Sequence, residues 1–198
     1  YTFAQPVVLT GKEAVGRMLR QEGLDSQPWG KLYPAGFWQQ VRFPDAALGE
    51  DTNLTYRLLE KAEHVALTGK AQYQYRKRPD SATSARPSEK IMSYTREAGL
   101  AFEDLLQRYP EYRAQATDFY LKAVVYNYLV LSRTSGLSAT LSSYLKTLKR
   151  ELHRYRKDFY RSPCFSFQTK AAITLSRLHL YGGMRRVLNL LKRSHKRW

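Results

Sequence analysis

We predict an α/β piece over residues 1–87 and an all-α piece over residues 88–198. Two observations support this division. Short apolar runs typical of strands occur only in the first part, where they alternate with helical patterns and with segments rich in Pro and Gly. From Ser88 onward, apolar residues recur only at helical spacing. With 198 residues and 43% apolar side chains, the chain can bury a core.

A short strand and a helix are expected first. Val7, Val8 and Leu9 form an apolar run. Thr10 and Glu13 then match a capping box, in which the Thr hydroxyl accepts from the backbone N–H three residues on while the Glu side chain reaches back. This pattern predicts a helix of about three turns that ends near Gly23.

The rest of the first part alternates irregular and regular segments. Residues 25–50 contain several Pro and Gly, which predicts irregular structure. Leucines at helical spacing predict a helix over residues 51–63, and strand patterns follow at residues 65–67 and 71–76. Residues 77–87 are polar and predict a loop.

Four helices are expected in the second part. Ser88 is placed to cap the first of them, which should stop before Pro110. The next two are expected over residues 111–133 and 138–157, and the last over about residues 168–194.

Positive charge is concentrated near the end of the chain. The net charge is +16, and residues 139–198 hold 15 basic and 2 acidic side chains. Such a field favours an anionic partner, which could be nucleic acid, anionic lipid or a phosphorylated substrate. No apolar run approaches the roughly 18 residues that span a bilayer, and no signal-peptide pattern is present. We therefore expect a soluble or membrane-peripheral chain; because it begins without Met, we also expect part of the protein to precede Tyr1.

Metal-ligating residues are sparse. Cys164 is the single cysteine, which excludes an intrachain disulfide and a cysteine-based metal site. The four histidines have no spacing that would place two of them on one helix face. The sequence therefore predicts no metal site within this chain.

One stretch is specific enough to suggest a chemistry. Three segments follow one another before the predicted helix at residue 51: Trp29-Gly30-Lys31-Leu32-Tyr33, then Val41-Arg42-Phe43-Pro44, then Gly49-Glu50-Asp51. In this order they resemble the acceptor-side half of a bacterial family 2 glycosyltransferase. The resemblance covers about residues 7–87 and implies that this part belongs to a nucleotide-diphospho-sugar transferase domain of the GT-A type, used in cell-surface polysaccharide synthesis.

The resemblance implies roles for the carboxylate pair. Asp51 is the expected general base of an inverting transfer, and Glu50 is its partner. At a helix start, backbone N–H groups and the helix dipole would hold the Asp51 carboxylate and keep it ionised. The alternative is that Asp51 only caps its helix, and the two roles can coexist.

Aromatic and basic residues complete the expected site. Trp29 and Tyr33 could stack on a sugar, although a Trp that fills the core beneath its loop is equally reasonable. Lys31 is expected to pair within the site, with Glu50 or with a phosphate.

A second motif is expected on the donor side. Residues 75–81 are similar to the basic Tyr-x-x-Arg-x-x-Ser loop that closes over the donor diphosphate in these enzymes. This implies phosphate contacts from Arg76, Arg78 and Ser81, since the planar Arg side chain donates paired hydrogen bonds to phosphate oxygens. A solvated basic turn is the alternative.

The chain departs from the family in one respect. It contains no Asp-x-Asp, the metal motif that the family places ahead of this region. The resemblance thus implies a divalent cation, Mg or Mn, whose ligands lie mostly outside this chain. The partners that it implies are a nucleotide-sugar donor and a saccharide acceptor that is lipid-linked or polymeric.

The sequence at the end of the chain predicts an amphipathic basic helix. Such a helix can lie in a membrane interface, where each Lys or Arg near an anionic leaflet contributes about 1 kcal/mol. This predicts a cytoplasmic protein at the inner face of the cell membrane; simple packing of the leucines is the alternative. The residues expected at the membrane surface are Arg185, Arg186, Lys192, Arg193, Lys196 and Arg197.

A different class of function also fits the charge. A basic helical protein could bind nucleic acid, or act as an interaction module without catalysis. However, the sequence has no recognisable reading-helix motif, zinc-binding spacing or RNP-type aromatic segment, and its charge lies in one terminal region. Nucleic acid is therefore the less favoured partner.

Overall fold

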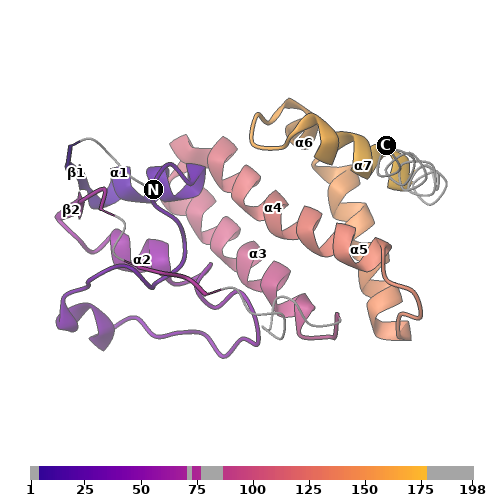
Figure 1. Ribbon diagram of the computed structural model, residues 1–198, viewed down its shortest axis with the longest axis horizontal. Helices are drawn as coiled ribbons and strands as arrows, with labels where there is room; N and C mark the ends of the chain where they lie inside the picture. The colour runs from indigo at the N-terminus through magenta and orange to yellow at the C-terminus, as the bar shows by residue number, and fades with distance from the viewer. Residues whose placement is uncertain (1–4, 71–72, 77–86, 178–198) are drawn as a thin grey trace, which may run out of the picture.

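The computed structural model describes residues 5–70, 73–76 and 87–177. Within them, the strands β1 (Val7–Thr10) and β2 (His64–Leu67) form a two-stranded antiparallel sheet in which Val7 pairs with Leu67 and Thr10 with His64. Figure 1 shows this sheet at one end of the molecule, beside the helices α1 (Gly11–Arg20) and α2 (Thr55–Leu59). The other end consists of helices.

The start of α1 follows the predicted capping box. The Glu13 backbone N–H donates to the Thr10 hydroxyl, and the Glu13 carboxylate accepts from the Thr10 backbone N–H at 2.8 Å. The helix ends at Arg20, where Gln21 takes the left-handed conformation. Local side-chain chemistry is therefore sufficient to place this helix.

The helical part is built around α4 (Arg113–Ser132), which runs through the centre of the molecule (Figure 1). It packs against α1 and α3 (Ile91–Arg108) and, on the other side, against α5 (Ala139–Arg154), α6 (Arg156–Arg161) and α7 (Phe167–Arg177). Because α4 is covered on several sides, its buried residues are not confined to one stripe. Among the described residues, no helix is both long and apolar enough to cross a bilayer.

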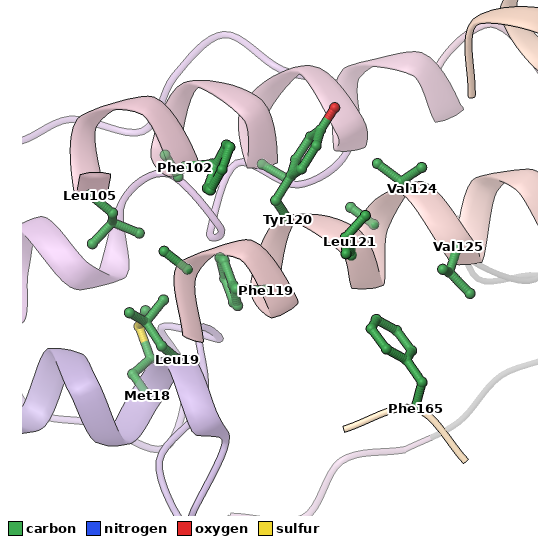
Figure 2. Close-up of a cluster of buried hydrophobic side chains, with 14 of the residues drawn as sticks. Met18, Leu19, Phe102, Leu105, Phe119, Tyr120, Leu121, Val124, Val125 and Phe165 are labelled. Atoms are coloured by element: carbon green, nitrogen blue, oxygen red, sulfur yellow. The ribbon is translucent and has the colours of Figure 1, made fainter. Parts of the chain in front are cut away.

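The hydrophobic core runs across the predicted boundary at residues 87 and 88. Met18 and Leu19 of α1 belong to the same buried cluster as Leu105 of α3 and Leu121 of α4. Figure 2 shows the two α1 side chains pointing toward Leu105 and Phe119. The change from mixed to helical secondary structure does not divide the core.

Three predicted elements differ from the structure. The helix expected over residues 51–63 is only the five residues of α2, and residues 50–54 form turns. The strand expected over residues 71–76 is absent from the described residues 73–76. Ser88 does not cap α3 with its side chain; its carbonyl accepts from the Ile91 backbone N–H instead.

The later helices match the predicted spans with smaller changes. α3 ends at Arg108, ahead of Pro110, as expected, and a 3₁₀ turn, η2 (Pro110–Tyr112), precedes α4. The helix predicted over residues 138–157 is divided at Tyr155 into α5 and α6. Of the last predicted helix, the structure describes α7.

Candidate functional site

Three exposed aromatic rings form a stacked group in the first part of the chain. Trp29 stacks on Tyr73, with ring centroids 4.7 Å apart and planes 18° apart, and on Tyr75, at 5.3 Å and 17°. Trp29 is 38% exposed, Tyr73 51% and Tyr75 55%. The alternative, that Trp29 fills the core beneath its loop, is therefore wrong. We call these three rings the aromatic platform.

Lys31 pairs with a carboxylate of its own loop. Its ammonium lies 3.0 Å from the Asp25 carboxylate and also donates to the Gln27 carbonyl. The expected ion pair with Glu50 is not formed. Because both charged side chains are largely buried, this pair orders the loop that carries Trp29.

Tyr33 supports the loop from inside. Its ring meets Trp38 edge to face at 5.6 Å and packs on a small buried cluster that contains Leu54 and Leu58. The hydroxyl is buried without a hydrogen-bond partner among the described residues. Burial, and then the Asp25 charge, raises the pKa of Tyr33 to about 12, so this hydroxyl stays protonated.

The loop of the platform is joined to the segment that carries Asp51. The Thr55 hydroxyl, at the start of α2, donates to the Ser26 carbonyl in a buried hydrogen bond. Together with the packing of Tyr33 on Leu54, this bond holds residues 25–33 and 50–55 against each other. Val41, from the segment between them, is buried in the same cluster. The structure thus brings together all three segments that carry the resemblance.

The carboxylate pair is docked on α3. The Ser93 hydroxyl, at the first turn of α3, accepts from the Leu48 backbone N–H and lies 2.9 Å from the Leu48 carbonyl. Farther along, the Asn53 amide donates to the buried Glu97 carboxylate at 3.1 Å. Between these anchors, Gly49 has a φ of +84°, and a Cβ there would lie 2.7 Å from the Tyr94 ring. These long-range contacts set the position of Asp51.

Asp51 is half-buried, and its pKa is shifted in the direction opposite to the one expected at a helix start. It precedes α2 by four residues, so the helix does not stabilise its charge directly. Burial, followed by repulsion from Glu50, raises the pKa of the Asp51 carboxyl above the ordinary 3.8, although the Thr52 hydroxyl donates to it at 3.3 Å. A raised pKa makes this carboxylate a stronger base than a solvated aspartate.

Tyr94 faces this carboxylate from α3. Burial raises the pKa of Tyr94 to about 12, and the negative charge of Asp51 adds to the shift. The Tyr94 hydroxyl is therefore neutral at physiological pH and remains a hydrogen-bond donor. The helical part of the chain thus contributes a group to the surroundings of Asp51.

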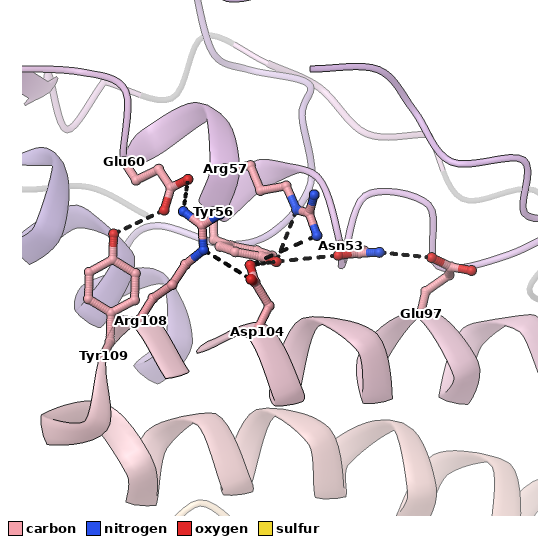
Figure 3. Close-up of polar contacts among 8 residues, drawn as sticks. All are labelled: Asn53, Tyr56, Arg57, Glu60, Glu97, Asp104, Arg108 and Tyr109. Carbon is pink, nitrogen blue, oxygen red and sulfur yellow. Dashed lines mark hydrogen bonds and ion pairs between the residues drawn. The ribbon is translucent and has the colours of Figure 1, made fainter. Parts of the chain in front are cut away.

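A polar network links α2 to α3 (Figure 3). The Tyr56 hydroxyl donates to Asp104 at 2.6 Å, and Arg108 bridges Asp104 at 3.0 Å and Glu60 at 2.8 Å. Tyr109 also donates to Glu60, at 3.1 Å. Because carboxylates and cations alternate in it, the network joins the two helices without leaving a charge unpaired.

The donor-side residues are only partly described. Arg76 is exposed and follows the aromatic platform directly. Arg78 and Ser81 lie outside the described residues. So do the six basic residues expected at a membrane surface, namely Arg185, Arg186, Lys192, Arg193, Lys196 and Arg197.

No metal centre is evident in the part of the chain that the structure describes, where no group of three His, Cys, Asp or Glu side chains is arranged to hold an ion. Glu50 and Asp51 alone are too few ligands for a Mg or Mn site within these residues. The role of a cation therefore stays a prediction that depends on ligands elsewhere.

The sequence interpretation missed Tyr73, the roles of Tyr75 and Tyr94, and the docking on α3. In an extended chain, side chains two positions apart point to the same side. This spacing could have grouped Tyr73 with Tyr75. Tyr94 has no such local signal, because its neighbours Gly49 and Asp51 lie more than forty residues away in the sequence.

Comparisons of the chain with protein-family models, with curated proteins and with solved structures found no match. The family 2 glycosyltransferase assignment therefore stays a prediction. It depends on the quoted motifs and on the geometry described above.

Proposed function

We propose that this chain carries the acceptor-binding surface and the general base of an inverting glycosyltransferase. In this proposal a sugar passes from a nucleotide-sugar donor to a saccharide acceptor that is lipid-linked or polymeric. The observation that carries the proposal is the exposed aromatic platform, which belongs to a loop held against the segment of a half-buried carboxylate with a raised pKa.

The platform is suited to a sugar ring. Pyranose rings present C–H groups on their faces, and a flat aromatic surface attracts such groups by dispersion and by its quadrupole. The planes of both tyrosine rings lie within 18° of the Trp29 plane, so the three rings form one stacked group whose exposed faces are nearly parallel. Order in the Trp29 loop comes from the Lys31–Asp25 pair, which lowers the entropic cost of binding.

The proposed step uses Asp51 as the base. Its carboxylate accepts the proton of the acceptor hydroxyl while that oxygen forms a bond to the anomeric carbon of the donor sugar. The bond from this carbon to the diphosphate oxygen breaks on the opposite face, the diphosphate keeps the electron pair, and the anomeric configuration inverts. Arg76, with Arg78 and Ser81, is proposed to neutralise the departing diphosphate.

A divalent cation, where present, would supply further charge neutralisation for the diphosphate. No part of the proposed role of Asp51 depends on it. The proposed location is the cytoplasmic face of the cell membrane, with the protein bound peripherally.

Binding of saccharides by the chain itself tests the acceptor side. Calorimetric titration with a panel of neutral and acidic oligosaccharides should identify at least one ligand for the parent chain. Trp29→Ala should weaken its binding about fivefold, because an aromatic contact of this kind contributes about 1 kcal/mol. The control is Phe167→Ala, which removes a ring that is 85% exposed at the start of α7. This variant should keep the saccharide affinity of the parent.

Two results would contradict the proposal. One is equal saccharide affinity of the parent and Trp29→Ala. The other is the absence of any saccharide binding together with sub-micromolar binding of duplex DNA at physiological salt, which would favour the nucleic-acid interpretation.

A further inference from the structure

The outward face of α5 carries cations and no carboxylate. Lys146, Lys149, Arg150 and His153 follow one another at spacings of three and four residues, which places them on one side of a helix. They line an open depression of about 320 Å³. We call these four residues the α5 basic face.

The opposite side of α5 is fully used in packing. Leu141, Leu148 and Leu152 are buried in the common core. Glu151, the one acidic residue of α5, accepts a hydrogen bond from the Tyr120 hydroxyl of α4 at 3.1 Å, so it is turned toward the core side. The helix thus separates its cations from its only carboxylate.

The Lys and Arg side chains of this face form no ion pair within the described residues. None of the ion pairs found there includes Lys146, Lys149 or Arg150. From Lys146 to Arg150 the helix rises by about 6 Å. This length is comparable to the Debye length at physiological salt, so the charges act on one partner together.

We propose that the α5 basic face is a docking surface for a bilayer that contains anionic phospholipid. The inference concerns a described helix and does not depend on the proposed transferase activity or on residues 178–198. Charge complementarity carries it, since phospholipid phosphates form an extended anionic plane that the cations of one exposed helix side can contact together. Figure 1 shows α5 at the end of the molecule away from α1 and α2.

The side chains of α5 favour a lipid surface over a single-stranded nucleic acid. Bases bind to such proteins by stacking on aromatic rings that alternate with cations. Both aromatic residues next to this face are engaged on its core side: the Tyr144 hydroxyl accepts from Asn127, and the Tyr155 ring meets Phe102 and Tyr120. On the outward face, the exposed His153 imidazole is the one ring among hydroxyl groups and cations of the described α5.

Vesicle sedimentation tests this surface. The probe is phosphatidylglycerol mixed with phosphatidylcholine, compared with phosphatidylcholine alone. Replacing Lys146→Gln together with Arg150→Gln should lower the partition coefficient on the anionic vesicles about 30-fold, at about fivefold for each cation. The reversal Lys146→Glu with Arg150→Glu should lower it further. Circular dichroism verifies that the variants fold.

The control changes the net charge by as much as the Lys146→Glu, Arg150→Glu reversal, but at positions outside α5. Lys61→Glu with Lys70→Glu alters exposed residues that follow α2 and β2, and its partition coefficient should stay within about twofold of the parent value. Unchanged binding of the α5 variants would overturn the proposal. So would an equal loss in the control, equal binding of the parent to neutral vesicles, or tighter binding to duplex DNA than to vesicles at the same salt.

Discussion

Asp51 is more costly to ionise in the folded chain than in the unfolded chain. Burial, and then Glu50, places the folded pKa above the ordinary 3.8. For a raised carboxyl pKa, the stabilisation is present at pH values below the unfolded pKa and is lost as the pH rises through the folded pKa. At neutral pH the charged Asp51 therefore lowers the free energy of unfolding.

Replacement by a neutral isostere should remove this cost. We expect Asp51→Asn to unfold in denaturant at a midpoint no lower than that of the parent at neutral pH. The difference should change in favour of the parent as the pH falls through the folded pKa of Asp51 toward 3.8. Urea unfolding at several pH values measures it. A variant that is much less stable at neutral pH would show that the carboxylate itself holds the segment.

Gly49 allows the close approach of the Asp51 segment to α3. Its φ of +84° and the 2.7 Å separation between an added Cβ and the Tyr94 ring both oppose a side chain. Gly49→Ala should therefore cost about 2 to 3 kcal/mol of stability, measured by denaturant unfolding.

The matched control is Gly36→Ala. An added Cβ at Gly36 would meet nothing within 4 Å, and the residue lies in the exposed 3₁₀ helix η1 (Ala35–Gln39). Its cost should stay within about 0.5 kcal/mol. Equal stability of the two variants would mean that the approach of Gly49 to Tyr94 is not required.

At the scale of elements, the polar network between α2 and α3 has a defined pH dependence. Burial alone would raise the pKa of Asp104, but hydrogen bonds from Tyr56 and Arg108 outweigh it and hold the pKa below the ordinary 3.8. For a depressed carboxyl pKa, the stabilisation is present above the unfolded pKa and is lost as the pH falls through the folded pKa.

Tyr56→Phe should weaken this link. Loss of the 2.6 Å hydrogen bond to a carboxylate is expected to cost about 1.5 to 3 kcal/mol at neutral pH, and the cost should diminish at pH values below 3.8. A double-mutant cycle with Asp104→Asn measures the coupling. The control Tyr160→Phe removes an exposed hydroxyl that is hydrogen-bonded to Thr174, and it should change the free energy of unfolding little. A pH-independent loss of stability in Tyr56→Phe would contradict the role assigned to the Tyr56–Asp104 hydrogen bond.

Elements that depend on local chemistry were predictable from the sequence, and those that depend on distant contacts were not. The capping box of α1 and the stop of α3 before Pro110 each involve neighbouring residues, and both were predicted. The short α2 was predicted too long, since residues 50–54 form turns in a segment that docks on Ser93 through Leu48 and on Glu97 through Asn53. The expected strand at residues 71–76 had the right alternation, but its tyrosines stack on Trp29 instead of joining a sheet.

For the whole molecule, the continuous core predicts one cooperative unit. Trp29 and Trp38 report on the first part by fluorescence, whereas far-ultraviolet circular dichroism mostly reports on the helices. In a Trp198→Phe background, the two signals should show coincident unfolding transitions. Separate transitions, with fluorescence changing first, would show that the two parts unfold independently.

A substitution in the core tests in a second way whether the two parts of the chain unfold together. Leu121 of α4 is fully buried in the common cluster. Leu121→Ala should lower the free energy of unfolding by about 2 to 5 kcal/mol and shift the transitions of both probes equally. A shift confined to the helical signal would contradict a shared core.

Transfer itself is the most direct test of the proposed function. The measurement is sugar transfer from a panel of nucleotide-diphosphate sugars by a polypeptide that joins this chain to the donor-binding part implied by the resemblance. Asp51→Asn should lower kcat at least about 100-fold and leave donor binding intact, because a general base contributes a factor of this size or more. Asp45→Asn, an exposed carboxylate on the same segment, should keep its activity. Full turnover by Asp51→Asn would contradict the central claim.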